Sequence, residues 1–147
     1  MNIRLSWEEV LCGAQVGLRR EVKALARGHE DAYGWKRDGW RQHIEGACAE
    51  LAVSRALDLS WSGIPLATWH GPDVGADIQV RYRPNPDQPD LGLRPTDDPS
   101  HRYILVHGSL PDYELVGWCY GHEHMTDTLQ FVTEGDLHGF EEWRDDE

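Results

Sequence analysis

Residues 71–83 read GPDVGADIQVRYR, and this stretch carries the clearest fold signal of the chain. Apolar and polar residues alternate along its second half, which is the two-residue period of a strand that buries one face. One face carries Ile78, Val80 and Tyr82, and the other carries Asp77, Gln79, Arg81 and Arg83. We therefore expect a strand over residues 77–83 that follows a tight turn at Gly75.

The pattern before this strand predicts an amphipathic helix over residues 6–27. Ser6 and Glu9 fit the capping box at its start, and Gly28 is a natural stop. Gly13 and Gly17 lie four residues apart and permit close packing against a neighbouring element. The apolar residues that recur at helical spacing form one stripe: Val10, Ala14, Leu18, Val22 and Leu25. The basic residues Arg19, Arg20 and Lys23 fall on other faces of this helix.

A second helix is expected over residues 40–57, after a polar, glycine-containing loop at residues 29–39. Small residues in its apolar stripe permit close contact with a sheet; the stripe is Ile44, Ala47, Cys48, Leu51 and Arg55. Glu50 projects about 60° from Ala47 on a helical wheel, so it lies at the edge of the stripe, and Glu45 lies on the opposite flank. We expect Glu50 to point along the surface of the sheet.

The second half of the chain has the pattern of strands and turns. Further strands are expected over residues 64–69, 91–94, 103–107, 113–120 and 129–132. The four residues SLPD, at 109–112, are short enough to join two of them as a hairpin. Two helices followed by several strands indicate an α+β domain, with two N-terminal helices packed on a mixed β-sheet.

Length and composition limit the class of protein. The 147 residues fit a single domain, and three widely spaced cysteines form neither a disulfide framework nor a zinc knuckle. No apolar run approaches the length of a membrane span, mean hydropathy is −0.62, and the first residues lack the layout of a signal peptide. These features favour a reduced, cytoplasmic setting without a membrane.

The net charge of −12 is unevenly distributed. Residues 1–60 hold 9 basic and 9 acidic residues, whereas residues 61–147 hold 5 basic and 17 acidic ones. This balance excludes a general basic coat for nucleic acid. The acidic half either serves solubility or forms a surface that mimics or repels DNA, and residues 141–147 are an acidic tail.

Candidate catalytic residues gather around the strand at 77–83. Pro72 and Asp73 precede the turn, and Asp77, Gln79 and Arg81 share one face of the strand. Oxygen ligands of this kind hold Mg²⁺, and a nearby arginine can bind the scissile phosphate. A glutamate from a packed helix, Glu50, can complete the metal sphere.

These residues resemble the PD-(D/E)XK, or restriction-endonuclease-like, superfamily. Pro72 and Asp73 correspond to the PD element, Gln79 and Arg81 take the places of its acid and its lysine, and Glu50 takes that of the helix glutamate. The chain also resembles a family of small uncharacterised phage proteins, in the segments WEEVLCGAQVGLRR, HIEGACAELAVSRAL, GPDVGADIQVR and YELVGWCYG. The resemblance implies a restriction-endonuclease-like core over residues 40–140, preceded by a helix and loop at 1–39. It further implies Mg²⁺-dependent or Mn²⁺-dependent cleavage of DNA in the cytoplasm of an infected or lysogenic bacterial host.

The sequence departs from that nuclease pattern at two positions. Gln79 replaces a carboxylate, so the metal loses one anionic ligand, and Asp77 is the candidate replacement. Arg81 replaces a lysine and binds phosphate well, although its high pKa makes it a poor partner in proton transfer. The expected metal ligands are therefore Asp73, Asp77 and Glu50, and the expected catalytic residues are Asp73, Gln79, Arg81 and Glu50.

The basic, tryptophan-containing segment GWKRDGWRQH, at residues 34–43, is the best candidate for contact with nucleic acid. Aromatic side chains can stack on bases while neighbouring cations neutralise phosphates. The expected contacts are Trp35, Lys36, Arg37 and Arg41, extended by Arg83. The alternative is a loop that its tryptophans hold against the core.

Two other interpretations remain open from the sequence. His122, Glu123 and His124 follow a strand and resemble a metal-binding triplet, although neighbouring histidines are also common on surfaces. The chain could also act without catalysis, if its acidic second half occupies the basic groove of a host nucleic-acid enzyme.

Overall fold

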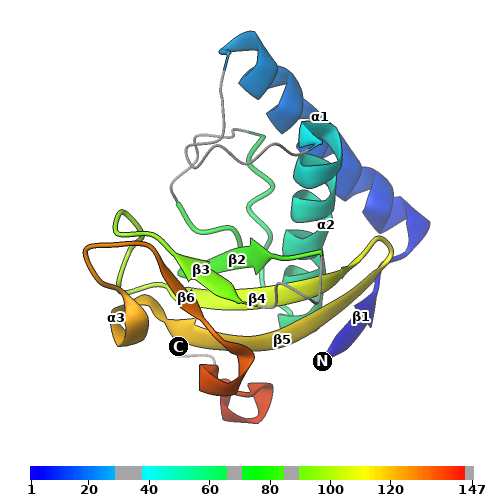
Figure 1. Cartoon of the computed structure of the whole chain (residues 1–147). Helices are drawn as coiled ribbons and strands as arrows, with labels where there is room; N and C mark the ends of the chain where they lie inside the picture. The colour runs from blue at the N-terminus through cyan, green and yellow to red at the C-terminus, as the bar shows by residue number, and fades with distance from the viewer. Residues whose placement is uncertain (29–37, 66–70, 85–89, 145–147) are drawn as a thin grey trace.

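The computed structural model describes residues 1–28, 38–65, 71–84 and 90–144. Two long helices lie over a sheet, and a smaller sheet and short helical turns complete the chain (Figure 1). The elements in chain order are β1 (Asn2–Arg4), α1 (Trp7–Ala26), α2 (Gly39–Leu57), β2 (Ile78–Tyr82), β3 (Leu91–Leu93), β4 (Arg102–Ser109), β5 (Asp112–Tyr120), α3 (Gly121–His124), β6 (Gln130–Val132), η1 (Glu134–Asp136) and η2 (Phe140–Glu142).

The main sheet is mixed and has the strand order β1-β5-β4-β2. β2 runs parallel to β4, whereas β4 with β5 and β5 with β1 are antiparallel. β3 and β6 form a separate antiparallel pair. The predicted α+β class, with two N-terminal helices on a mixed sheet, is confirmed. The predicted hairpin is also confirmed, because β4 and β5 are joined through Leu110 and Pro111.

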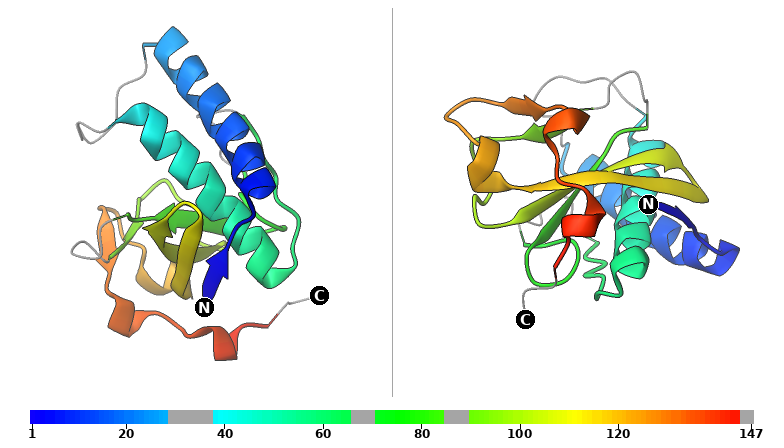
Figure 2. Two further views of the ribbon diagram at one scale, coloured as in Figure 1. Left: turned by 90° about the vertical axis from the view of Figure 1, so that its right-hand side faces the viewer. Right: turned by 90° about the horizontal axis from the view of Figure 1, so that it is seen from below.

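The two faces of the main sheet contact different layers. Ile104 and Val106 of β4 pack with the α2 residues Ala49 and Val53. Residues of β4 on the opposite face, such as Leu105, pack with β3 and β6. Figure 2 shows α2 on one side of the sheet and the β3–β6 pair on the other. Alternation along the strands therefore decides which side of the molecule each candidate residue faces.

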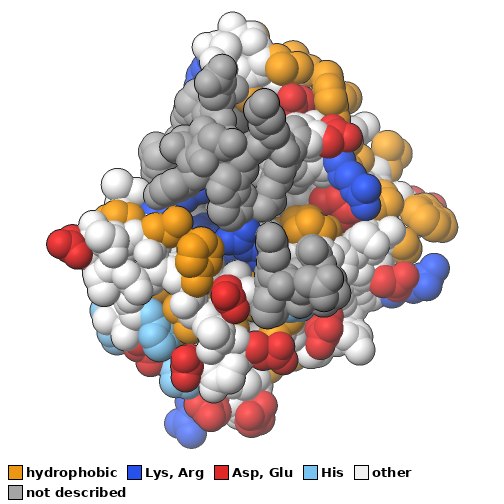
Figure 3. All heavy atoms as spheres, viewed as in Figure 1, with side chains coloured by type: hydrophobic (Ala, Val, Ile, Leu, Met, Phe, Trp, Pro, Cys, Tyr) orange, Lys and Arg blue, Asp and Glu red, His pale blue; other side chains and the backbone are white. Residues whose placement is uncertain are grey.

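The helix prediction for α1 is confirmed in extent but wrong in the face that packs. Ser6 and Glu9 form the capping box, yet Leu18 and Leu25 of the expected apolar stripe are 47% and 58% exposed. A line of apolar side chains accordingly runs along the outside of α1 (Figure 3). The buried face of α1 instead contains two glycines, one alanine and two charged residues: Gly13, Gly17, Arg20, Glu21 and Ala24.

Two glycines of α1, Gly13 and Gly17, explain why this face of the helix packs against α2. A Cβ atom added at Gly17 would lie 2.4 Å from the Cα of Ile44, and one added at Gly13 would lie 2.6 Å from the Sγ of Cys48. The backbones of α1 and α2 therefore touch where no side chain fits between them. Close packing at Gly13 and Gly17 is confirmed, and it turns Leu18 and Leu25 outward.

The short elements differ most from the sequence expectations. β1 was not expected, whereas β3 and β6 lie within the strands expected at 91–94 and 129–132 and pair with each other outside the main sheet. Ile64 and Pro65 lie outside any strand, and the rest of the strand expected at 64–69 lies outside the described residues. Trp61 instead forms an isolated bridge with Val74. None of the described helices is long and apolar enough to cross a membrane.

Candidate functional site

Asp73 lies beside β2, which is an edge strand of the main sheet. Val74 forms a bridge with Ile78, so the chain turns back on itself at Gly75 and runs along the free edge of β2. One carboxylate oxygen of Asp73, Oδ2, accepts a hydrogen bond of 2.9 Å from the backbone N–H of Val80. The sheet edge thus holds the half-buried Asp73 side chain in one orientation.

Glu50 approaches the same edge from α2 and is buried. Its two oxygens accept hydrogen bonds from both terminal nitrogens of Arg20, at 2.7 and 3.0 Å. The indole N–H of Trp61 donates a third, at 3.0 Å. Trp61 also bridges to Val74, the residue after Asp73, so the loop at 61–62 ties the glutamate to the strand edge.

Electrostatics connect the two carboxylates. The pKa of Asp73 is raised to about 7, first by desolvation and second by the charge of Glu50. The N–H of Val80, Arg81 and Arg20 oppose this rise without cancelling it. Glu50 and Asp73, which the sequence placed in one site, are therefore close enough to interact.

Gln79 and Arg81 extend from β2 toward the other face of the sheet. Gln79 donates to the carbonyl of Gly71 at 2.8 Å. Arg81 donates to the carbonyl of Gly92 in β3, at 3.1 Å, and pairs with Asp97 at 2.8 Å. Both side chains line a cleft of about 720 Å³. Glu50 and Arg81 are both close enough to Asp73 for their charges to shift its pKa, Glu50 upward and Arg81 downward.

Asp77 does not point toward the Glu50–Asp73 pair. Its two carboxylate oxygens bind the guanidinium of Arg102, at 2.7 and 2.8 Å. Arg102 in turn lies 4.2 Å from the ring centroid of Trp143. Asp77 therefore anchors the start of β2 and β4 to the C-terminal segment.

The residues expected to contact nucleic acid are only partly described. Trp35, Lys36 and Arg37 lie outside the described residues. Arg41 lies in the first turn of α2 with an exposed side chain. Arg83 follows β2, donates to the carbonyl of Asp90 at 3.3 Å and lies 5.7 Å from the ring centroid of Phe131.

Glu45 is a buried carboxylate that was not predicted from the sequence. Its Oε2 accepts hydrogen bonds from the hydroxyl of Tyr113 at 2.8 Å and from the backbone N–H of Leu110 at 3.0 Å. Burial, together with the neighbouring Glu45, raises the pKa of Tyr113. Glu45 lies four residues before Ala49 and seven before Ala52, so helical spacing from those two buried alanines could have placed it.

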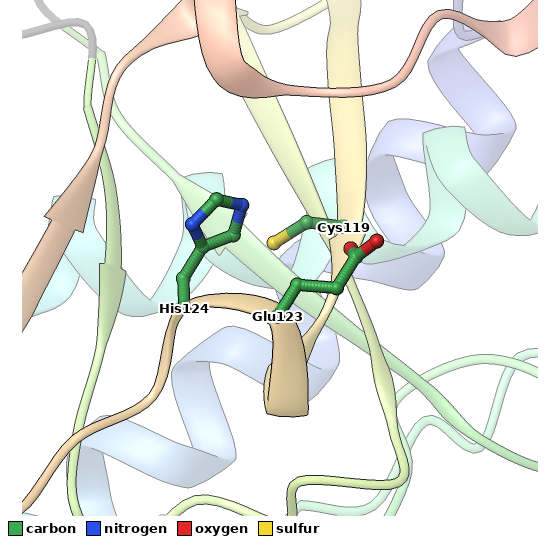
Figure 4. Close-up of side chains that lie close together, drawn as sticks. All are labelled: Cys119, Glu123 and His124. Atoms are coloured by element: carbon green, nitrogen blue, oxygen red, sulfur yellow. The ribbon is translucent and has the colours of Figure 1, made fainter.

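A separate group of potential metal ligands lies where β5 meets α3. Donor atoms of Cys119, Glu123 and His124 all lie within 4.8 Å of one another (Figure 4). Burial raises the pKa of the Cys119 thiol to about 12. The sequence triplet contained His122 instead of Cys119, but the His122 ring stacks on Tyr120 with their centroids 5.2 Å apart.

Arg20 and Trp61 were also missed as partners of Glu50. Arg20 had been placed on a polar face of its helix, and only the contact between α1 and α2 brings it inward. In comparisons with known protein families, with curated proteins and with solved structures, the chain matches none of them.

Proposed function

We propose that this protein is a metal-dependent phosphodiesterase that acts on nucleic acid, with Glu50 and Asp73 as ligands of Mg²⁺ or Mn²⁺. The single observation that supports it is the meeting of these two carboxylates at the edge of β2. They come from elements far apart in sequence, and Trp61 contacts one carboxylate and the strand segment of the other. The proposal includes a restriction-endonuclease-like core as the finer description of the α+β fold.

The residues at this edge fit a hard cation. Carboxylate oxygens are the ligands that Mg²⁺ prefers, and the cation usually keeps several waters besides one or two carboxylates. Among the described residues, hydrogen bonds reach only Oδ2 of Asp73, so Oδ1 is available to a cation. When bound, the cation would polarise the phosphate and activate a water.

The arginines have two different tasks under this proposal. Arg20 fixes the orientation of Glu50 through both of its oxygens. Arg81 is close enough to Asp73 for its charge to lower the pKa of that carboxyl, so it can hold a phosphate beside the metal. Arg81 cannot serve as the proton acceptor, because a guanidinium stays charged in proteins. Asp77 takes no part, since Arg102 occupies both of its oxygens.

The test measures cleavage of single-stranded and double-stranded DNA and RNA with Mg²⁺ or Mn²⁺. We expect Asp73→Asn and Glu50→Gln to abolish cleavage by the folded protein, as judged from an unchanged circular-dichroism spectrum. Asp112→Asn is the matched control, because Asp112 is exposed and pairs with Arg4. Absence of metal-dependent cleavage of every substrate by the unaltered protein would overturn the proposal.

A second candidate function is a non-catalytic interaction with a basic partner. Arg20 already neutralises Glu50, and Arg81 already pairs with Asp97, so these groups also make sense as structural contacts. Exposed acids occur along the second half of the chain, including Asp112, Glu114, Asp127, Glu134 and Asp136. Capture of a basic host nucleic-acid enzyme that weakens steeply with salt, together with inactivity in the cleavage test, would favour this function.

A further inference from the structure

The turn from β5 into α3 brings three different metal-ligand types together. Cys119 is the penultimate residue of β5, and Glu123 and His124 close the single turn of α3. Their donor atoms lie within 4.8 Å of one another, and Figure 4 shows the His124 ring facing the Cys119 thiol. Thiolate, imidazole and carboxylate are the three ligand types found around Zn²⁺ in proteins.

The Glu123 carboxylate is held in place by its neighbours. Oε2 accepts the backbone N–H of Tyr120 at 2.7 Å, and Oε1 is hydrogen-bonded to Nε2 of His138 at 2.8 Å. His138 is itself fixed, since its backbone pairs with that of Trp118. A carboxylate offers about four lone-pair positions, so two remain for a metal. Hydrogen bonds from outer residues to a ligating carboxylate are the usual support of a metal site.

Burial gives the cluster one closed side and one open side. The Cys119 side chain is fully buried against β3 and β4, among Leu91, Leu93 and Leu105. His124 is half-buried, and Glu123 is exposed. A metal can therefore enter from the α3 side, and three protein ligands leave the fourth position of a tetrahedral Zn²⁺ to water.

We propose that Cys119, Glu123 and His124 form a zinc site with one open position. With Zn–S near 2.3 Å and Zn–N near 2.0 Å, donors in a tetrahedral site lie about 3.5 Å apart, so no two donor atoms have to approach each other by more than about 1.3 Å. Rotation of the half-buried His124 side chain supplies this movement. The site is independent of the proposed phosphodiesterase, because a thiolate selects a softer metal than the oxygen ligands Glu50 and Asp73 do.

The test is a titration of the full chain with Zn²⁺, followed by Co²⁺ substitution. All variants carry Cys12→Ser, which removes the exposed thiol. We expect one Zn²⁺ per chain, and a thiolate-to-cobalt absorption band in the near ultraviolet. His124→Gln and Cys119→Ser should weaken Zn²⁺ binding by more than about tenfold and remove or shift the band. His122→Gln, two residues away and stacked on Tyr120, is the matched control and should bind as before.

Two results would overturn the zinc site. One is the absence of stoichiometric Zn²⁺ binding by the Cys12→Ser chain that carries no other change, and the other is equal binding by His124→Gln and His122→Gln. If Cys119→Ser fails to fold because the thiol is in the core, His124→Gln decides alone, since that side chain is only half-buried. Loss of zinc binding and loss of nucleic-acid cleavage are separate measurements, so either proposal can fail without the other.

Discussion

Arg20 of α1 and Glu50 of α2 form two parallel hydrogen bonds, of 2.7 and 3.0 Å, across the contact between the two helices. Their side chains are only 11% and 10% exposed. The pair therefore joins the helix contact to the edge of β2, where Glu50 meets Asp73. Stability and site geometry depend on the same two residues.

Removing only one partner of this ion pair should destabilise the fold strongly. Arg20→Met leaves Glu50 buried beside Asp73 without its guanidinium, and breaking a buried pair in this way costs about 3–5 kcal/mol. The double variant Arg20→Met with Glu50→Leu should recover most of that loss, because no unpaired charge remains. Urea unfolding of both variants measures the two free energies. If Arg20→Met lowers the free energy of unfolding by less than about 1 kcal/mol, the ion pair contributes no more than a solvent-exposed pair does, and the prediction is wrong.

The two helix glycines Gly17 and Gly46 should respond to alanine in opposite directions. A Cβ at Gly17 would meet the backbone of Ile44, whereas a Cβ at Gly46 would meet nothing within 4 Å. Gly46→Ala should stabilise the protein by about 0.5–1 kcal/mol, because alanine restricts the unfolded chain. Gly17→Ala should destabilise it by about 1–3 kcal/mol through overpacking. Thermal unfolding of both variants provides the comparison, and equal shifts would contradict the backbone contact.

Stability should depend on pH through Asp73. Its pKa is raised to about 7 in the folded protein from an ordinary value of 3.8, so the native state binds more protons than the unfolded state between these values. The contribution of Asp73 is therefore fully present below about pH 4 and is lost as the pH rises through about 7, with a slope of at most about 1.4 kcal/mol per pH unit. Asp73→Asn should remove this slope. Urea unfolding of both proteins at several pH values measures the difference, and parallel pH profiles would contradict the prediction.

Replacement of an exposed leucine of α1 should change the free energy of unfolding much less than replacement of a buried leucine of β4. Leu18 is 47% exposed on α1, and Leu105 is fully buried in β4. Leu18→Ala should change the unfolding free energy by less than about 1 kcal/mol, whereas Leu105→Ala should cost about 2–5 kcal/mol. A large loss in Leu18→Ala would show that the outer side of α1 is covered in solution.

The parts of the fold that depend on contacts between residues close in sequence were predicted. The capping box at Ser6 and the short turn at Pro111 act locally, so the ends of α1 and the β4–β5 hairpin could be placed from the sequence. The strands expected at 91–94 and 129–132 correspond to β3 and β6, but their pairing with each other could not be predicted, and β1 was not predicted at all, because each of these pairings joins segments distant in sequence. The three residues of β1 are too few to show a period.

The residues of the candidate site also separate into those that could be predicted from local sequence and those that depend on contacts between distant segments. Glu50 was identified from its angle on a helical wheel, and Asp73 from its place before a turn. Arg20 looked like a surface cation, because Gly13 and Gly17 indicated close packing of their helix but not which of its other residues would come against α2. Cys119 fell within the strand expected at 113–120, and its nearness to Glu123 and His124 depends on a one-turn helix that was not predicted from the sequence.

The glycine contact between the helices makes distant positions interdependent in mutation. Arg20 follows Gly17 by three residues, so any side chain at Gly17 that separates α1 from α2 also withdraws the guanidinium from Glu50. A tolerated change at that glycine would then require a compensating change at Glu50, and the two would be inherited together. The position of the Glu50 carboxylate at the strand edge thus depends on a residue that contributes no side chain at all.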